Sequence, residues 1–193
     1  MVKPRVGVLA LQGDVPEHLR AAEQAGAAAV PVRRRATLDE VDALILPGGE
    51  STTLGKLLER YDLMEPIRAR ARAGMPILGT CAGLILLARE IEGSDQPRLG
   101  LLDVTVRRNA YGRQVESFET DVAAPALGPK PVRAVFIRAP IVTRTGPEVE
   151  VLAAAAGAPI LIRQGGLIGA AFHPEMAGED RIHRYLLEQI GAR

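Results

Sequence analysis

Apolar residues in the first half of the chain occur in short runs that alternate with segments of helical spacing. The compact runs predict four strands, at Arg5–Leu11, Ala27–Val32, Ala43–Leu46 and Met75–Gly79. Helical spacing and helix-stop glycines predict helices at Val15–Ala25, Leu38–Val41 (one turn), Thr53–Arg60, Leu63–Ala73 and Leu84–Ile91. Strands that alternate with helices in this way favour a parallel sheet covered by helices on both faces.

The second half has many short strands and few helices. Gly, Pro and Asn signals separate strands at Val104–Arg107, Val115–Asp121, Val132–Ile137, Val149–Ala153, Pro159–Ile162 and Leu167–Phe172. One last helix is predicted at about Asp180–Ile190. We therefore expect an α/β fold with a doubly wound, mostly parallel central sheet, helices on both faces and added antiparallel strands in the second half. No repeat or linker divides the chain, so residues 1–193 should form one domain.

Composition narrows the class of protein. The 193 residues include 24 Lys and Arg against 23 Asp and Glu, and this balance argues against nucleic-acid binding, which needs a clearly basic face. The sequence contains no run of 18 apolar residues, so no membrane span is predicted. No signal peptide is recognisable either, and we expect a cytoplasmic protein. One cysteine, Cys81, excludes an intramolecular disulfide and a four-cysteine zinc site. That residue either packs in the core or performs chemistry.

Four segments pass from a predicted strand directly into glycine or polar residues. They are Gln12–Asp14, Pro47–Ser51, Thr80–Gly83 and His173–Glu175. In open α/β sheets, ligands bind outside the carboxyl ends of the strands. If the strands are parallel, all four segments meet at one edge of the sheet, and we expect the functional site there.

The segment Gly79–Gly83 has the form G-x-C-x-G between an apolar strand and an apolar helix. This arrangement parallels the nucleophile elbow, in which a serine occupies a strained turn between strand and helix. The positive end of a helix dipole also stabilises negative charge at such a position. An isolated cysteine is more often a buried packing residue, but the elbow context favours a nucleophile at Cys81.

A thiolate nucleophile needs a histidine that a third group orients. His18 and His183 lie in predicted helices, and we interpret them as solvated or helix-packing residues. His173 follows a strand at the expected edge, and in extended chain Glu175 would point the same way as His173. Cys81, His173 and Glu175 are therefore a candidate catalytic triad.

The glycine-rich segment Pro47–Ser51 is the third candidate component. Its backbone N–H groups could approach a developing oxyanion, and Ser51 or Thr52 would cap the following helix. A phosphate-binding loop is excluded, because the spacing to Gly55-Lys56 is one residue too long and Leu57 stands where Ser or Thr is required. No G-x-G-x-x-G opens the first helix, which argues against a dinucleotide.

Two arginines follow later strands and could clamp a substrate carboxylate. They are Arg108 and Arg138. Because the chain has 21 arginines, position alone gives either residue little weight. Taken together, the candidate site residues predict neither a metal site nor a cofactor.

Over nearly its whole length the chain resembles the glutaminase subunits of pyridoxal 5′-phosphate synthase, which are class I glutamine amidotransferases with a Cys-His-Glu triad. The triad motifs indicate the class, and Leu46–Thr53 and Phe136–Pro140 narrow the resemblance to this family. Asp14 and Tyr111 lie at positions that we expect to vary. The resembling segments are Gly7–Gly13, Leu46–Thr53, Gly79–Leu84, Arg108–Gln114, Phe136–Pro140 and Phe172–Glu175.

The resemblance implies a role for each candidate residue. Cys81 would attack the side-chain amide of L-glutamine, His173 would transfer the protons, and Glu175 would orient His173. Backbone N–H groups of Gly49 and Ala82 would form the oxyanion hole. Glutamine would be bound by Gly49, Glu50, Ser51, Arg108, Ile137 and Arg138.

The resemblance also implies a partner. A separate synthase subunit would combine the ammonia with a pentose phosphate and a triose phosphate, in a dodecameric ring with one glutaminase per synthase subunit. The free chain would be weakly active until the partner orders the Gly48-Gly49 loop. Three alternatives stay open: a glutaminase serving another synthase, such as the imidazole glycerol phosphate enzyme; a cysteine hydrolase of different substrate; and a non-catalytic binding module with Cys81 as packing.

Overall fold

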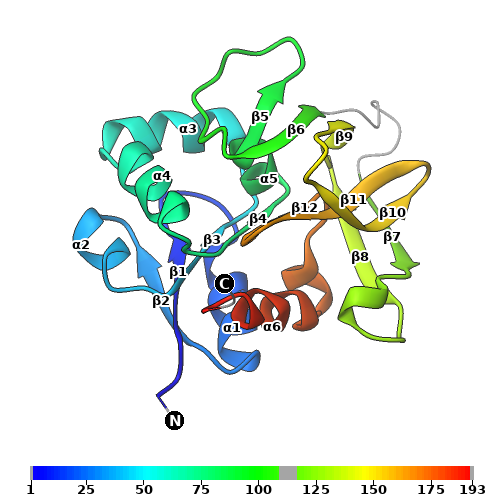
Figure 1. Cartoon of the computed structure of the whole chain (residues 1–193), viewed down its shortest axis with the longest axis horizontal. Coiled ribbons are helices and arrows are strands. Elements are labelled where there is room, and N and C mark those ends of the chain that lie inside the picture. The colour runs from blue at the N-terminus through cyan, green and yellow to red at the C-terminus, as the bar shows by residue number, and fades with distance from the viewer. Residues whose placement is uncertain (1, 109–116, 192–193) are drawn as a thin grey trace.

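A central sheet of seven strands organises the molecule in the computed structural model, which describes residues 2–108 and 117–191 (Figure 1). The strand order is β10-β11-β12-β4-β3-β1-β2, and the five strands from β12 to β2 are parallel. β10 and β11 extend the sheet in antiparallel fashion. The strands are β1 (Arg5–Leu9), β2 (Ala28–Val32), β3 (Ala43–Leu46), β4 (Ile77–Thr80), β10 (Glu150–Ala155), β11 (Ala158–Gln164) and β12 (Leu167–Ala170).

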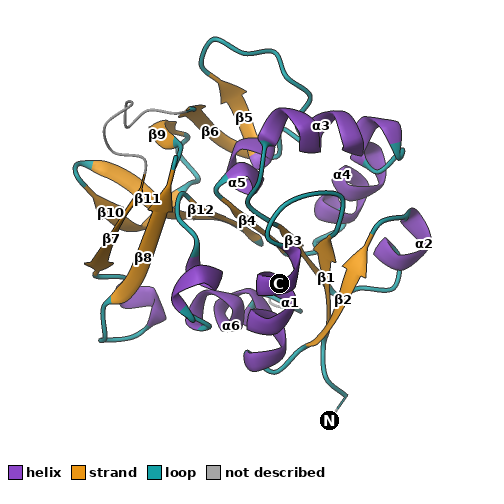
Figure 2. Ribbon diagram, turned by 180° about the vertical axis from the view of Figure 1, so that it is seen from behind, coloured by secondary structure: helices purple, strands orange, loops and turns teal. Residues whose placement is uncertain are grey.

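Helices cover both faces of this sheet (Figures 1 and 2). α1 (Val15–Gln24) and α6 (Arg181–Glu188) pack on one face, while α3 (Ser51–Arg60), α4 (Met64–Arg72) and α5 (Ala82–Leu87) pack on the other. The residues of β3 and β4 are buried, as parallel strands covered on both faces must be. The predicted fold class is confirmed. No helix among the described residues is long and apolar enough to cross a membrane.

Shorter elements complete the second half. A three-stranded sheet contains β5, β6 and β9, and β7 pairs with β8 in a hairpin. The first two residues of the strand predicted at Val115–Asp121 lie outside the described residues, and β7 begins at Ser117. The remaining elements are α2 (Arg35–Leu38), β5 (Ala88–Ile91), β6 (Leu102–Arg107), β7 (Ser117–Val122), β8 (Val132–Ile137), β9 (Ile141–Thr145) and the 3-10 helices η1 (Pro125–Leu127) and η2 (Pro174–Ala177).

The helix predicted at Leu84–Ile91 is wrong in its second half. α5 ends at Leu87, and Ala88 turns to φ −58° and ψ 140°. Residues 88–91 then pair with β6 as the parallel strand β5. An apolar run does not by itself distinguish a buried helix from a buried strand, so the available pairing partner decides. β9 was not predicted, and the turn expected at Leu38–Val41 is found three residues earlier as α2.

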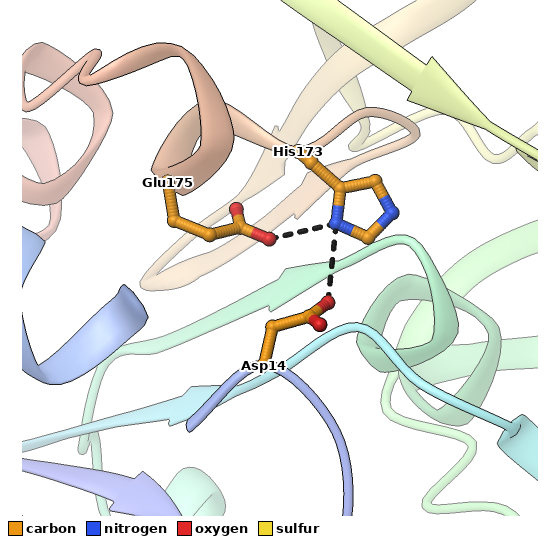
Figure 3. A group of neighbouring side chains, drawn as sticks. All are labelled: Asp14, His173 and Glu175. Carbon is orange, nitrogen blue, oxygen red and sulfur yellow. Dashed lines mark hydrogen bonds and ion pairs between the residues drawn. The ribbon is translucent and has the colours of Figure 1, made fainter. Parts of the chain in front are cut away.

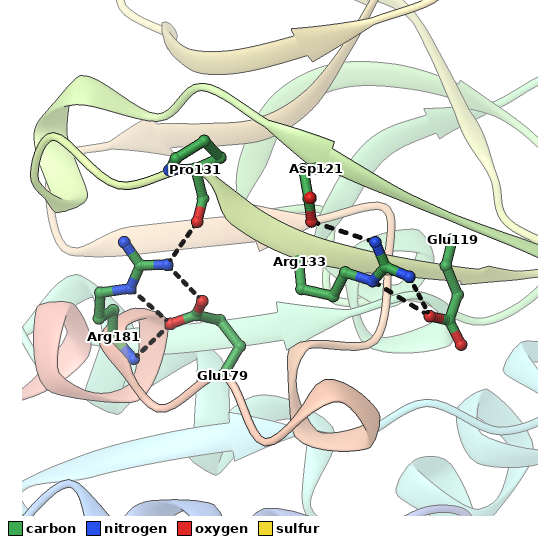
Figure 4. Close-up of polar contacts among 6 residues, drawn as sticks. All are labelled: Glu119, Asp121, Pro131, Arg133, Glu179 and Arg181. Carbon is green, nitrogen blue, oxygen red and sulfur yellow. Dashed lines mark hydrogen bonds and ion pairs between the residues drawn. The ribbon is translucent and has the colours of Figure 1, made fainter.

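The β7–β8 hairpin is tied to the chain that follows β12 (Figure 4). Arg181 at the start of α6 donates to the backbone carbonyl of Pro131 at 2.8 Å. Arg133 on β8 pairs with two carboxylates of β7. The backbone N–H of His173 donates to the carbonyl of Val135 on β8 at 2.8 Å. These contacts hold the end of β8 beside the loop that carries His173.

Candidate active site

The carboxyl ends of β1, β3, β4 and β12 open onto one cavity of about 440 Å³. β1 and β3 flank the point at which the strand order reverses, where doubly wound sheets bind their ligands. Glu175 lies behind His173 rather than on the cavity wall. Nine residues of the predicted site line the cavity: Gly49, Glu50, Ser51, Cys81, Ala82, Arg108, Ile137, Arg138 and His173.

Cys81 occupies the sharp turn between β4 and α5. Its backbone has φ 48° and ψ −103°, a conformation that strains any residue other than glycine. The Ala170 carbonyl accepts its N–H at 2.8 Å, and its Sγ lies 3.8 Å from the carbonyl oxygen of Ile137. Ala82 begins α5, so its N–H is one of the helix-start donors without a partner inside the helix. The turn therefore presents a thiol beside a free backbone donor.

His173 and Glu175 form a buried hydrogen-bonded pair. His173 Nδ1 and Glu175 Oε1 are 2.7 Å apart (Figure 3). The extended geometry expected for this pair is wrong, because Pro174 begins the 3-10 helix η2 and Glu175 lies inside that helix. Proline suits this position, since its fixed φ is compatible with a helical turn. The tight turn brings the carboxylate under the ring.

Asp14 is a second carboxylate at the same ring nitrogen, a role that was not predicted for it. Its Oδ2 lies 3.4 Å from His173 Nδ1 (Figure 3). Asp14 precedes α1, yet its side chain makes no capping hydrogen bond. Burial lowers the pKa of His173, but hydrogen bonds with Asp14, Cys81 and Glu175 outweigh burial and raise that pKa to about 12. The imidazole therefore stays protonated at neutral pH.

The Gly48-Gly49 loop packs directly against the histidine. A Cβ on Gly48 would lie 2.4 Å from Cε1 of His173, a distance that no side chain can occupy. Gln12, on the loop after β1, accepts the backbone N–H of Glu50 through Oε1 at 2.9 Å. The loops after β1 and β3 thus fix the cavity wall next to the ring.

Glu50 caps α3, in place of the Ser51 or Thr52 cap predicted from the sequence. Its carboxylate accepts the backbone N–H groups of Thr52 at 3.1 Å and Thr53 at 2.7 Å. Hydrogen bonding, first from the Thr53 side chain, lowers the pKa of Glu50. A carboxylate accepts such bonds better than a hydroxyl because it is charged and offers two oxygens.

The two arginines reach the cavity from different elements. Arg108, directly after β6, donates to Thr52 Oγ1 at 2.9 Å and to Gln96 Oε1 at 2.7 Å. Arg138 follows β8 and has a positive φ of 46°. Residues 109–114, the rest of the motif that begins at Arg108 and includes Tyr111, lie outside the described residues. The cavity therefore has two cationic groups near the triad.

Comparison with known proteins identifies the family. The model of the SNO glutamine amidotransferase family matches residues 8–192. The chain belongs to this family. Similar curated proteins include the pyridoxal 5′-phosphate synthase subunit PdxT of Frankia casuarinae, 55% identical over 98% of this chain and 96% of the relative. The PdxT subunit of Mycobacterium leprae is 56% identical over 97% of this chain and 96% of the relative. A crystal structure described as glutamine amidotransferase has a TM-score of 0.92 and 50% identity, over 96% and 98% of the two chains.

The other two histidines of this glutamine amidotransferase are both buried, so of the two interpretations offered from the sequence they have the helix-packing role and not the solvated one. His18 on α1 and His183 on α6 have ring centroids 5.2 Å apart. The pKa of His18 is lowered well below its ordinary value, mainly by burial. Burial is also the main cause that lowers the pKa of His183 to about 4. Both rings are therefore neutral at physiological pH.

One group of possible metal ligands exists among the described residues. It consists of Asp14, His173 and Glu175, whose ligand atoms lie within 4.8 Å of one another. The 2.7 Å contact between His173 Nδ1 and Glu175 engages that nitrogen in a direct hydrogen bond. A bound ion would have to displace this bond, so the geometry fits an oriented histidine better than a metal centre.

Asp14→Asn should move the alkaline limb of the pH–activity profile to lower pH. The variant removes a negative charge 3.4 Å from His173 Nδ1, which destabilises the imidazolium and lowers the pKa of His173. Titration of the ring by NMR, together with kcat/KM against pH, measures the shift. Glu17→Gln, in the first turn of α1 and half-buried beside Arg20, is the matched control. Equal pH–activity profiles for the two variants would contradict the conclusion that the Asp14 carboxylate raises the pKa of His173.

Proposed function

We propose that the whole chain is one glutaminase domain that hydrolyses L-glutamine to L-glutamate and ammonia in the cytoplasm, as a subunit of pyridoxal 5′-phosphate synthase. The observation that carries the proposal is a strained cysteine and a histidine that line one cavity, with Glu175 hydrogen-bonded to the histidine, in a member of the glutamine amidotransferase family. Relatives named PdxT at about 55% identity over nearly the whole chain support the assignment to this synthase.

In the first half of the reaction, the thiolate of Cys81 attacks the side-chain amide carbon of glutamine. A C–S bond forms, and the amide oxygen becomes an oxyanion held by the backbone N–H groups of Gly49 and Ala82. His173 then gives its proton to the amide nitrogen, the C–N bond breaks, and ammonia leaves. The raised pKa of His173 supports this step, because the ring already holds the proton that the leaving group needs.

Water completes the cycle. The neutral ring of His173 takes a proton from water, which attacks the glutamyl thioester, and the C–S bond breaks as Cys81 leaves as thiolate. The new carboxylic acid releases the second proton of the water to solvent, and glutamate departs as the carboxylate. Throughout, Glu175 holds His173 in one orientation through Nδ1, so that Nε2 is the nitrogen available to the reacting atoms.

Glutamine binding is assigned to residues around this centre. We assign its α-carboxylate to the Arg108 and Arg138 guanidinium groups, which are suited to carboxylate recognition. Ile137 contributes its backbone and an apolar surface. Gly49, Glu50 and Ser51 contribute the β3–α3 turn; because the Glu50 carboxylate already caps α3, its contact to substrate comes from the remainder of the residue.

Ammonia imposes the need for a partner. Ammonia is mostly protonated near neutral pH, and ammonium is no nucleophile, so a biosynthetic glutaminase has to deliver it through a shielded route. We assign the acceptor role to a separate synthase subunit that joins ammonia to a pentose phosphate and a triose phosphate, in a dodecameric ring with one glutaminase per synthase subunit.

The test is pyridoxal 5′-phosphate formation by a purified synthase subunit with either glutamine or ammonium as the nitrogen source. With glutamine, product should form only when this chain is added, and glutamate release should rise on mixing. With excess ammonium, the synthase alone should suffice. Glutamine-dependent product without this chain, or no product with it while ammonium still works, would contradict the proposal. Glutamate release with only the imidazole glycerol phosphate synthase would favour the other glutaminase assignment.

A further inference from the structure

A buried line of polar side chains extends from the candidate triad through α1 to α6. His18 is fully buried. Its Nε2 lies 2.9 Å from Thr80 Oγ1 and 3.4 Å from Glu175 Oε2. Its Nδ1 lies 3.0 Å from Nε2 of His183. The reaction described above uses none of the groups on this side of Glu175.

The second oxygen of Glu175 needs a donor from this side. Oε1 is bonded to His173, whereas Oε2 is buried and makes no hydrogen bond of standard geometry among the described residues. Burial, the largest cause, raises the pKa of Glu175, and the nearby charge of Asp14 raises it further. A buried anionic oxygen without a donor is costly. Of the side chains around Glu175, Asp14 is itself an acceptor, whereas Nε2 of His18 lies 3.4 Å from Oε2 and can supply a proton.

The surroundings of His18 favour the tautomer that can donate a proton to Glu175 Oε2. Burial and the neighbouring rings of His183 and His173 lower the pKa of His18, so the ring carries one proton. A carboxylate is a stronger acceptor than a neutral nitrogen, which places that proton on Nε2. The Thr80 hydroxyl can rotate to accept it as well. Nδ1 of His18 then accepts from Nε2 of His183, 3.0 Å away.

We propose that His18 is a positioning residue of the triad, which donates through Nε2 to the second carboxylate oxygen of Glu175 and keeps that carboxylate aligned with His173. The inference rests on the proposed glutaminase function. His18 touches neither the cavity nor the substrate, and it acts only through Glu175. His183 contacts the other ring nitrogen of His18, so the side chains of all three histidines of the chain lie in one connected line with Glu175.

Two variants at position 18 test the proposal in the complex with the synthase subunit. His18→Leu keeps the apolar bulk and removes the donor, whereas a glutamine side chain can place an amide N–H near the former Nε2. We expect His18→Leu to lower kcat by about tenfold with little change in KM, which is at the low end of what loss of an outer partner of a functional histidine costs. The alkaline limb of the pH–activity profile of His18→Leu should move to lower pH, and His18→Gln should restore most of kcat.

His183→Leu is the matched structural control, because it removes a ring of the same size from the same buried contact without touching Glu175. It should lower the melting temperature as much as His18→Leu and lower kcat less. Equal losses of kcat in the two leucine variants with unchanged pH profiles and no rescue by glutamine would overturn the proposal. Wild-type chain that releases no glutamate would instead overturn the proposed function itself.

Nitrogen NMR of wild-type His18 tests the same idea without a mutation. The proposal requires a proton on Nε2 at neutral pH. A neutral ring protonated on Nδ1 would contradict it, even if the leucine variants fail to fold.

Discussion

Replacement of Cys81 by alanine is expected to lower glutamate release by at least ~10⁴-fold, as loss of a nucleophile does in comparable triads. The effect should be this large because no other thiol exists in the chain. The fold should persist, since the side chain is small and its strained backbone is held by the Ala170 carbonyl. Glutamate release in the presence of the synthase subunit, together with the melting temperature, measures both expectations.

The ammonium reaction provides the control for this variant. Product formation from ammonium by the synthase with Cys81→Ala bound should match that of the synthase alone, which separates lost chemistry from a damaged assembly. A variant that releases glutamate at the wild-type rate would mean that Cys81 is a packing residue and the chain a non-catalytic module. Activity toward peptides or esters in preference to glutamine would indicate a different cysteine hydrolase.

Gly83→Ala should cause a large loss of stability for a change of a single methyl group. A Cβ at position 83 would lie 2.0 Å from the backbone oxygen of Leu46 and 2.9 Å from its Cβ. α5 must then move away from β3 and carry the turn at Cys81 with it. Overpacking of this kind costs about 3 kcal/mol, which corresponds to roughly 8 °C in melting temperature for a chain of this length.

Gly166→Ala is the matched control, because its Cβ would meet Pro76 at an ordinary 3.5 Å. It should change the melting temperature little and leave glutamate release intact. Gly83→Ala should reduce glutamate release as well, even at temperatures where it is folded, because the donor at Ala82 shifts with the helix. Equal melting temperatures for the two glycine variants would contradict the idea that the close approach of α5 to β3 matters for stability.

Periodicity predicted most of the central sheet, since buried parallel strands are short apolar runs flanked by glycine. β3 is found with the bounds expected, and β1 and β4 differ by a few residues at their ends. The failure at residues 88–91 has a physical cause, because that segment is a strand only through its pairing with β6. Local sequence contains no information about a partner that lies more than ten residues further along the chain.

Cys81, His173 and the β3–α3 turn meet at one cavity because four parallel strands end at one edge, which the alternation of strands and helices in the sequence predicted. The additional roles of Asp14 and His18 were not foreseeable from residue type. Asp14 belongs to a segment that was expected at this edge, but only the packing of its loop against His173 reveals the second carboxylate. His18 looked like an ordinary helix residue, and its burial against α6 was set by tertiary packing.

The measurement that tests the central claim most directly is rapid acid quenching of the complex during turnover of isotopically labelled glutamine, followed by mass spectrometry of its peptides. A glutamyl group should be found on the peptide that contains Cys81, and it should disappear as glutamine is exhausted. Glutamate formed at the full rate with no label on Cys81, or with label on another residue, would contradict a thioester mechanism at this cysteine.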